Sequence, residues 1–245
     1  MANKKNNMKV DFVAIGAHPD DVELSAAGTL MKEIEQGKTV ALIDLTEGEL
    51  GSRGTIETRY EEAAAASKIM GVTDRVNLNL GDGFFDLSQE NKIKIIEQIR
   101  YYQPEVVFVN AKSDRHPDHG RGAQLAKEAC FLSGLVKIET SYEGAPQKPW
   151  RPKIVLGYIQ DRYLEPNFVV DITAQVPKKI EAILAYKTQF YNPDAEGPQT
   201  PISGEDFIDF LKGRWAGFGR SIGVDYAEGF TVDRTIGIKT ISDII

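Results

Sequence analysis

Apolar and polar residues alternate along the first half of the chain in blocks whose lengths suit strands and helices in turn. Four short apolar runs predict strands at residues 10–17, 39–45, 75–80 and 104–110. Segments with apolar residues at helical spacing follow them and predict helices over residues 21–37, 56–70, 87–102 and 122–134. Such alternation predicts an α/β fold, a Rossmann-like, doubly wound and mostly parallel sheet with helices on both faces.

The pattern is less regular in the second half of the chain. It predicts strands at 153–159 and 167–172, helices at 174–191 and 205–215, a loop at 192–204, and a strand or extended segment at 225–241. Residues 139–152 are the best candidate linker. We interpret residues 1–245 as a single domain with flexible residues 1–8, a core at 9–138, and a C-terminal extension at 153–245 that completes the active-site cleft.

Composition and charge narrow the classes of function. The chain has 245 residues, of which 42% are hydrophobic, and a net charge of −7, which argues against a nucleic-acid partner. Its apolar runs fall short of the roughly 18 to 20 residues of a membrane helix, and residues 12–17 are too short for a signal-peptide core. The single cysteine, Cys130, excludes an intramolecular disulfide and predicts a small buried hydrophobe. We therefore expect a soluble, cytoplasmic protein without a membrane partner.

Histidine is rare and concentrated in two motifs. The three histidines, His18, His116 and His119, lie in two segments that share the tripeptide His-Pro-Asp. The first motif follows the first predicted strand, and the second follows the fourth. In a doubly wound sheet of order 3-2-1-4-5 these strands are neighbours, and the crevice at their carboxyl ends is the usual binding site. The two motifs are therefore expected to meet.

This cluster has the chemistry of a catalytic zinc site. Imidazole and carboxylate are zinc ligands, and a catalytic zinc keeps three protein ligands and one open position. His18 and Asp21, three residues apart at a loop-to-helix junction, are expected to share an ion with His119. Asp20 is then free to act as a general base. His116 is left to stabilise an oxyanion or protonate a leaving amine.

Within this interpretation, Asp114 or Asp118 is expected to orient the ring of His116 through its second nitrogen.

Other interpretations of the same residues exist. Asp20 and Asp21 also suit a helix N-terminus as capping residues, and loop histidines are often ordinary surface residues. Paired aspartates after a first strand are shared by receiver-like Mg²⁺ phosphorylation domains, which are about half this length. A non-catalytic metal-binding or carbohydrate-binding module is a further alternative.

The two histidine motifs, at residues 17–21 and 116–119, resemble those of the LmbE-like or PIG-L family of zinc-dependent N-acetylglucosamine deacetylases. More narrowly, the chain is similar to the bacillithiol-biosynthesis deacetylases. That similarity rests on residues 48–55, 114–120, 187–190 and 226–230, and the resemblance as a whole spans about residues 10–230.

The resemblance assigns roles to individual residues. It implies one zinc ion per chain, held by His18, Asp21 and His119. It makes Asp20 the general base and gives His116 a role at the tetrahedral intermediate. It also places a tyrosine of the C-terminal part near the oxyanion, for which Tyr186 is the best match.

The implied reaction is removal of the N-acetyl group from an N-acetylglucosamine conjugate by a zinc-bound water that Asp20 activates. In the subfamily this conjugate is N-acetylglucosaminyl malate, and arginine suits its carboxylates, so Arg53 and Arg115 are expected to bind the malyl group. Related enzymes act on other amides, including mycothiol-pathway substrates and S-conjugates. A substrate of this kind is the alternative to the malate conjugate. Other divalent metals fit the same ligands. The resemblance also suggests a homo-oligomer, either a trimer or a hexamer.

Overall fold

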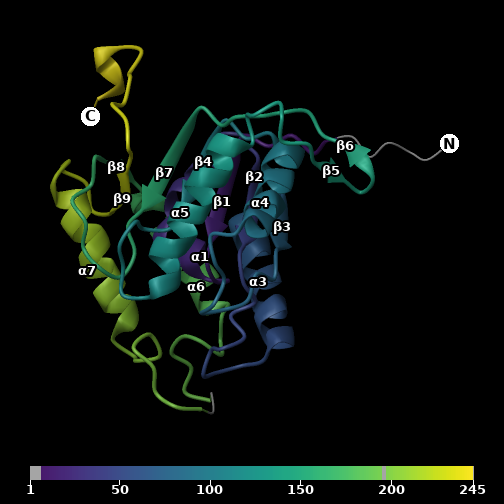
Figure 1. Cartoon of the computed structure of the whole chain (residues 1–245). Helices are drawn as coiled ribbons and strands as arrows, with labels where there is room; N and C mark the ends of the chain where they lie inside the picture. Colours follow the sequence, from purple (N-terminus) through teal and green to yellow (C-terminus); the bar gives the residue numbers. More distant parts are fainter. Residues whose placement is uncertain (1–6, 195–196, 245) are drawn as a thin grey trace.

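A seven-stranded, mostly parallel sheet forms the centre of the protein (Figure 1). The structure is a computed structural model that describes residues 7–194 and 197–244, so the flexibility expected for residues 1–8 lies almost entirely outside the described residues. The strands lie in the order β3-β2-β1-β4-β7-β9-β8. Their bounds are β1 Phe12–Gly16, β2 Val40–Asp44, β3 Asp74–Asn77, β4 Val106–Val109, β7 Ile154–Tyr158, β8 Phe168–Asp171 and β9 Ala227–Thr231.

The first five strands across this order run parallel, whereas β9 is antiparallel to both of its neighbours. The predicted fold class is therefore confirmed, including the pairing of the first and fourth strands. The antiparallel pair of β8 and β9 at one edge explains why the hydrophobic pattern of the second half lacks the regular alternation of strand and helix.

Helices cover both faces of the sheet because successive strand residues point to opposite sides. On β1, Val13 and Ile15 pack into a core with α4 and α5, whereas Ala14 packs into a second core with α2 and α6. The helices are α1 Asp21–Ser25, α2 Ala27–Glu35, α3 Ile56–Met70, α4 Gln89–Tyr102, α5 Pro117–Leu132, α6 Val176–Leu184 and α7 Phe207–Arg220, with short 3₁₀ turns at η1 Thr173–Gln175 and η2 Ile241–Asp243. No helix among residues 7–194 and 197–244 has both the length and the apolar character that crossing a bilayer requires.

Two boundaries near the histidine motifs differ from the sequence prediction. The helix predicted over 21–37 is broken into α1 and α2 at Ala26, whose φ of −135° is not helical. The fifth helix starts five residues early, at Pro117, because His116 caps it and proline is well suited to the first helical position. His119 therefore lies on a helix rather than in a loop.

The second half also differs in detail. The predicted linker contains a small hairpin, β5 Ser141–Tyr142 with β6 Ala145–Pro146, and the last strand covers only β9. Buried Glu228 joins β9 to the first half: its carboxylate accepts hydrogen bonds from the backbone N–H groups of Gly28 and Thr29 on α2, and also from Lys179 Nζ on α6 at 2.5 Å. The later elements are thus anchored to α2, beside α1 and the first histidine motif.

Candidate metal centre

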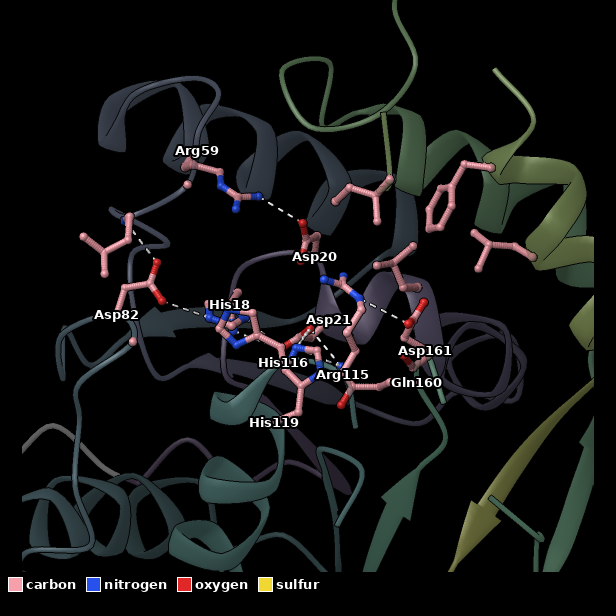
Figure 2. A pocket seen from close by; sticks show the side chains of 18 of the residues that line it. His18, Asp20, Asp21, Arg59, Asp82, Arg115, His116, His119, Gln160 and Asp161 are labelled. Carbon is pink, nitrogen blue, oxygen red and sulfur yellow. Dashed lines mark hydrogen bonds and ion pairs between the residues drawn. The ribbon is translucent and has the colours of Figure 1, made fainter. Parts of the chain in front are cut away.

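The carboxyl ends of three neighbouring parallel strands supply the histidines of the candidate site and Gln160 (Figure 2). The first histidine motif follows β1, the second follows β4, and Gln160 follows β7. The turn after β1 is tight: a Cβ added at Gly16 would lie 3.0 Å from the His18 carbonyl oxygen and 3.2 Å from the Asp21 Cβ. The two motifs meet as the topology predicts.

The three predicted metal ligands lie together in buried positions. His18 Nδ1 is 3.6 Å from Asp21 Oδ2, and His119 Nε2 is 3.0 Å from Asp21 Oδ1. Burial opposes protonation of His119, but the carboxylates of Asp21 and Asp114 outweigh it and raise the pKa of His119 to about 9. A cation that binds here must therefore displace protons from the imidazole.

The donor set and its spacing fit a divalent transition metal. Ligand atoms about 2.0–2.1 Å from a tetrahedral zinc lie about 3.3 Å from one another. This value falls between the His119–Asp21 distance of 3.0 Å and the His18–Asp21 distance of 3.6 Å. Among the described residues, the three-residue groupings whose donor atoms all lie within 4.8 Å of one another are His18 with His116 and His119, and His18 with Asp82 and Asp118; Asp21 belongs to neither, although it contacts both predicted histidine ligands. His18 is common to both groupings and to the predicted ligand set.

Carboxylates behind both metal-facing histidines fix their orientation. His18 Nε2 lies 3.0 Å from Asp82 Oδ1 and 3.5 Å from Asp118 Oδ2, while His119 Nδ1 lies 2.5 Å from Asp114 Oδ2. This corrects the prediction that the side chain of Asp114 or Asp118 orients His116: the two carboxylates contact the other two rings. Each ring can therefore donate its outer N–H to a carboxylate and present its inner nitrogen to a cation.

His116 faces the same cavity but carries a different hydrogen bond. Its Nδ1 accepts the backbone N–H of Asp118 at 3.3 Å, so a neutral ring carries its proton on Nε2. Burial, together with the neighbouring rings of His18 and His119, lowers the pKa of His116. The ring is thus a neutral donor, half-buried, with its centroid 4.6 Å from that of His18.

Asp20 lies in the cavity wall in a strained conformation. Its φ of 121° lies in the region that favours glycine, a strain that costs about 1–3 kcal/mol and that clusters at functional sites. Arg59 Nη1 donates to Asp20 Oδ2 and to the Pro19 carbonyl oxygen, both at 3.0 Å. Burial raises the pKa of Asp20 to about 6, although Arg59 acts in the opposite direction.

The other predicted residues fall in three different places. Arg115 lines the cavity, and its Nε donates to Asp161 Oδ2 at 3.2 Å. Arg53 is buried outside the cavity lining, with its backbone carbonyl accepting from Gln189. Tyr186 is fully buried and donates its hydroxyl to Glu23 at 2.9 Å. The structure thus does not bring Arg53 or Tyr186 to the metal cluster.

Six polar residues of the cavity were missed from the sequence: Ser25, Arg59, Asp82, Gln160, Asp161 and Arg214. Arg59 had a local signal, because it lies one turn inside the helix that follows the glycine-rich loop. Asp82 also follows a strand, in the predicted loop between β3 and α4. Gln160 and Arg214 come from the irregular second half and show no local motif.

The cavity is small and has two chemically different sides. Its volume is about 240 Å³, somewhat below the range for small-molecule sites, about 300–1,000 Å³. The histidines and aspartates form one side. Leu24, Ile202, Phe207 and Leu211, which pack together, give the other side an apolar surface, whereas Leu50 lies beside Asp82 and donates its backbone N–H to Asp82 Oδ2 at 3.1 Å.

Known proteins share both this sequence pattern and this fold. The family model described as PIG-L: GlcNAc-PI de-N-acetylase matches residues 13–130. The uncharacterized deacetylase YaiS of Escherichia coli is 34% identical over 130 residues, which are 51% of this chain and 70% of that protein. A conserved protein of Thermus thermophilus is 33% identical, with a TM-score of 0.83 over 94% of this chain and 98% of the other. The chain belongs to the PIG-L family of de-N-acetylases.

Relatives of lower sequence identity are named for different reactions and substrates. The diacetylchitobiose deacetylase of Thermococcus kodakarensis is 28% identical over 198 residues, 77% of this chain and 73% of that protein. A Bacillus anthracis protein named probable N-acetyl-alpha-D-glucosaminyl L-malate deacetylase 2 is 24% identical over 71% of this chain and 78% of its own length. The 4-oxalmesaconate hydratase of Pseudomonas putida is 25% identical over 73% of each chain. PIG-L membership therefore does not by itself select a substrate.

Proposed function

We propose that the protein is a metal-dependent hydrolase that removes the N-acetyl group from an N-acetylglucosamine conjugate. The observation that carries this proposal is the buried group of His18, Asp21 and His119, with Asp20 and His116 facing the same small cavity. The family match supports the same chemistry.

His18, Asp21 and His119 would hold the cation, which we propose to be zinc. When bound, a divalent cation supplies a Lewis acid that polarises an amide carbonyl and makes water acidic enough to lose a proton near neutral pH. The ligand set suits this task because two neutral imidazoles and one carboxylate leave a zinc ion with room for another partner.

Asp20 accepts the proton of the attacking water. Its raised pKa makes it more basic than an ordinary aspartate, while Arg59 fixes the orientation of its carboxylate. His116 donates its Nε2–H to the oxygen that becomes negative as water adds to the carbonyl carbon. The C–N bond then breaks, the amine takes the proton from Asp20, and acetate is released.

We infer that the conjugate is N-acetylglucosaminyl malate, the substrate class of bacillithiol biosynthesis. Arg115 at the cavity supports this, because a guanidinium suits the carboxylates of malate. The name of the Bacillus anthracis relative supports it as well. The size of the cavity favours one sugar ring over a larger glycoside.

Acetate release by the zinc-loaded protein tests both the deacetylase activity and the choice of the malate conjugate as substrate. The substrates are N-acetylglucosaminyl malate, N,N'-diacetylchitobiose and methyl N-acetylglucosaminide, with metal content measured on the same samples. We expect the highest kcat/KM for the malate conjugate. A higher value for diacetylchitobiose would overturn the malate assignment, and no acetate from any substrate would overturn the deacetylase assignment.

A further inference from the structure

The Asp21 carboxylate is held by three N–H donors besides its contacts with histidine rings. Asp21 Oδ2 accepts from the backbone N–H of His18 and from Asn110 Nδ2, each at 2.9 Å. Asp21 Oδ1 accepts from Gln160 Nε2, also at 2.9 Å. Both carboxylate oxygens are therefore fixed in direction by neutral groups.

The orientation of the Gln160 amide follows from its other partners. Its Oε1 accepts from the backbone N–H of Ala111 and from Asn110 Nδ2, each at 3.0 Å. A backbone N–H can only donate, so the atom that faces Ala111 must be the oxygen and the nitrogen must face Asp21. Gln160 is 4% exposed and Asn110 is 1% exposed, so water does not compete for these bonds.

The main chain that carries Gln160 is itself anchored by a later helix. Arg214 on α7 donates Nη1 to the Gln160 carbonyl oxygen and Nη2 to that of Asp161, the latter at 2.8 Å. Gln160 Nε2 also lies 3.4 Å from His119 Nε2, so one side chain touches two of the predicted ligands. Figure 2 shows Gln160 beside His119 and Asp21, on the side of the cavity away from Asp82.

We propose that Gln160 and Asn110 are positioning residues that hold the Asp21 carboxylate in the direction that metal binding requires. An amide can do this without adding charge, whereas a lysine or arginine in the same place would repel a divalent cation. Loss of hydrogen bonds to a metal-binding residue typically weakens metal affinity 10- to 100-fold. The inference rests on the proposed function in one respect, which is that Asp21 is a metal ligand.

Zinc affinity, measured by competition with a chromophoric chelator, tests the inference on the whole chain. Gln160→Met keeps an unbranched side chain of similar length and removes the donor, so we expect zinc affinity to fall 10- to 100-fold. Saturating zinc should return kcat to within a few-fold of the wild-type value, with KM unchanged. Gln98→Met is the matched control, because Gln98 is a buried glutamine on α4 outside the cavity lining, and it should leave affinity unchanged.

The Asp21→Asn background distinguishes failure of the positioning role of Gln160 from failure of Asp21 as a metal ligand. If Gln160 acts through Asp21, Gln160→Met should weaken zinc binding less than about three-fold in that background, because coupled residues are not additive. Unchanged affinity in Gln160→Met, beside a large loss in Asp21→Asn, would overturn the positioning role alone. Wild-type affinity in Asp21→Asn would instead overturn Asp21 as a ligand. If Gln160→Met does not fold by circular dichroism, Asn110→Ala, which removes the donor to Oδ2, provides the same comparison.

Discussion

Replacing Asp20 by asparagine should stop catalysis while the metal stays bound. Asparagine has the same shape as aspartate but does not accept a proton at neutral pH. General-base catalysis typically contributes 10²- to 10⁴-fold to rate, so we expect kcat to fall by that factor. Zinc content should stay near one per chain, because the proposed ligands are His18, Asp21 and His119.

The structure also gives the expected cost in stability. In Asp20→Asn, the amide oxygen can still accept the hydrogen bond that Arg59 Nη1 now donates at 3.0 Å. The change then costs less than the roughly 1.5–3 kcal/mol of unfolding free energy that a hydrogen bond to a charged group is typically worth, because that bond is kept. In Asp20→Ala the buried guanidinium keeps the Pro19 carbonyl but loses the Asp20 carboxylate with which it is paired, and breaking a buried ion pair costs about 3–5 kcal/mol.

The two variants therefore separate chemistry from folding. Acetate release should fall equally in both, while urea denaturation should show the alanine variant to be the less stable by at least about 2 kcal/mol, the difference between those two costs. Metal analysis should find wild-type zinc in both. Loss of zinc from Asp20→Asn would show that Asp20 is a ligand, and retained kcat would show that another group accepts the proton.

Further changes test other parts of the site. Chelation by EDTA should abolish acetate release, and added zinc should restore it; activity that survives complete metal removal would contradict the proposed chemistry. Asp114→Ala frees the ring of His119 and should weaken zinc binding 10- to 100-fold in chelator competition, an effect that a merely exposed carboxylate would not produce. Arg115→Ala should raise KM for the malate conjugate about ten-fold, with little change for methyl N-acetylglucosaminide; equal effects on both would remove Arg115 from malate binding. Tyr186→Phe should leave kcat within about three-fold but cost about 1.5–3 kcal/mol in urea denaturation, because its hydroxyl donates to Glu23 away from the cavity; a large loss of kcat at unchanged stability would restore its predicted oxyanion role.

The core of the fold and the meeting of the two motifs could be predicted because parallel strands carry strong local signals. Buried apolar runs mark the strands, and the pairing of β1 with β4 follows from the doubly wound topology. That pairing places His18 and His119 together without any knowledge of distances.

The partners of the histidines could not be predicted in the same way. The sequence predicts that Asp114 or Asp118 orients the ring of His116, but α5 begins at Pro117, and the Asp114 carboxylate contacts His119 instead while that of Asp118 contacts His18. A helix start displaced by one turn changes which side chains share a face. Gln160 follows a strand with no recognisable motif, and only the sheet order shows that it lies beside β4.

The distribution of charge around the cluster is consistent with a cation held at Asp21. Within residues 7–194 and 197–244, guanidinium groups bind two of the clustered carboxylates: Arg59 pairs with Asp20, and Arg121 pairs with Asp118 at 2.7 Å. Apart from the histidines, the groups described as donating to Asp21 are neutral amides. Asp20 is thus oriented by a fixed cation, whereas Asp21 keeps a charge that a fixed cation does not neutralise. A divalent metal is the partner that this charge and the two imidazoles together favour.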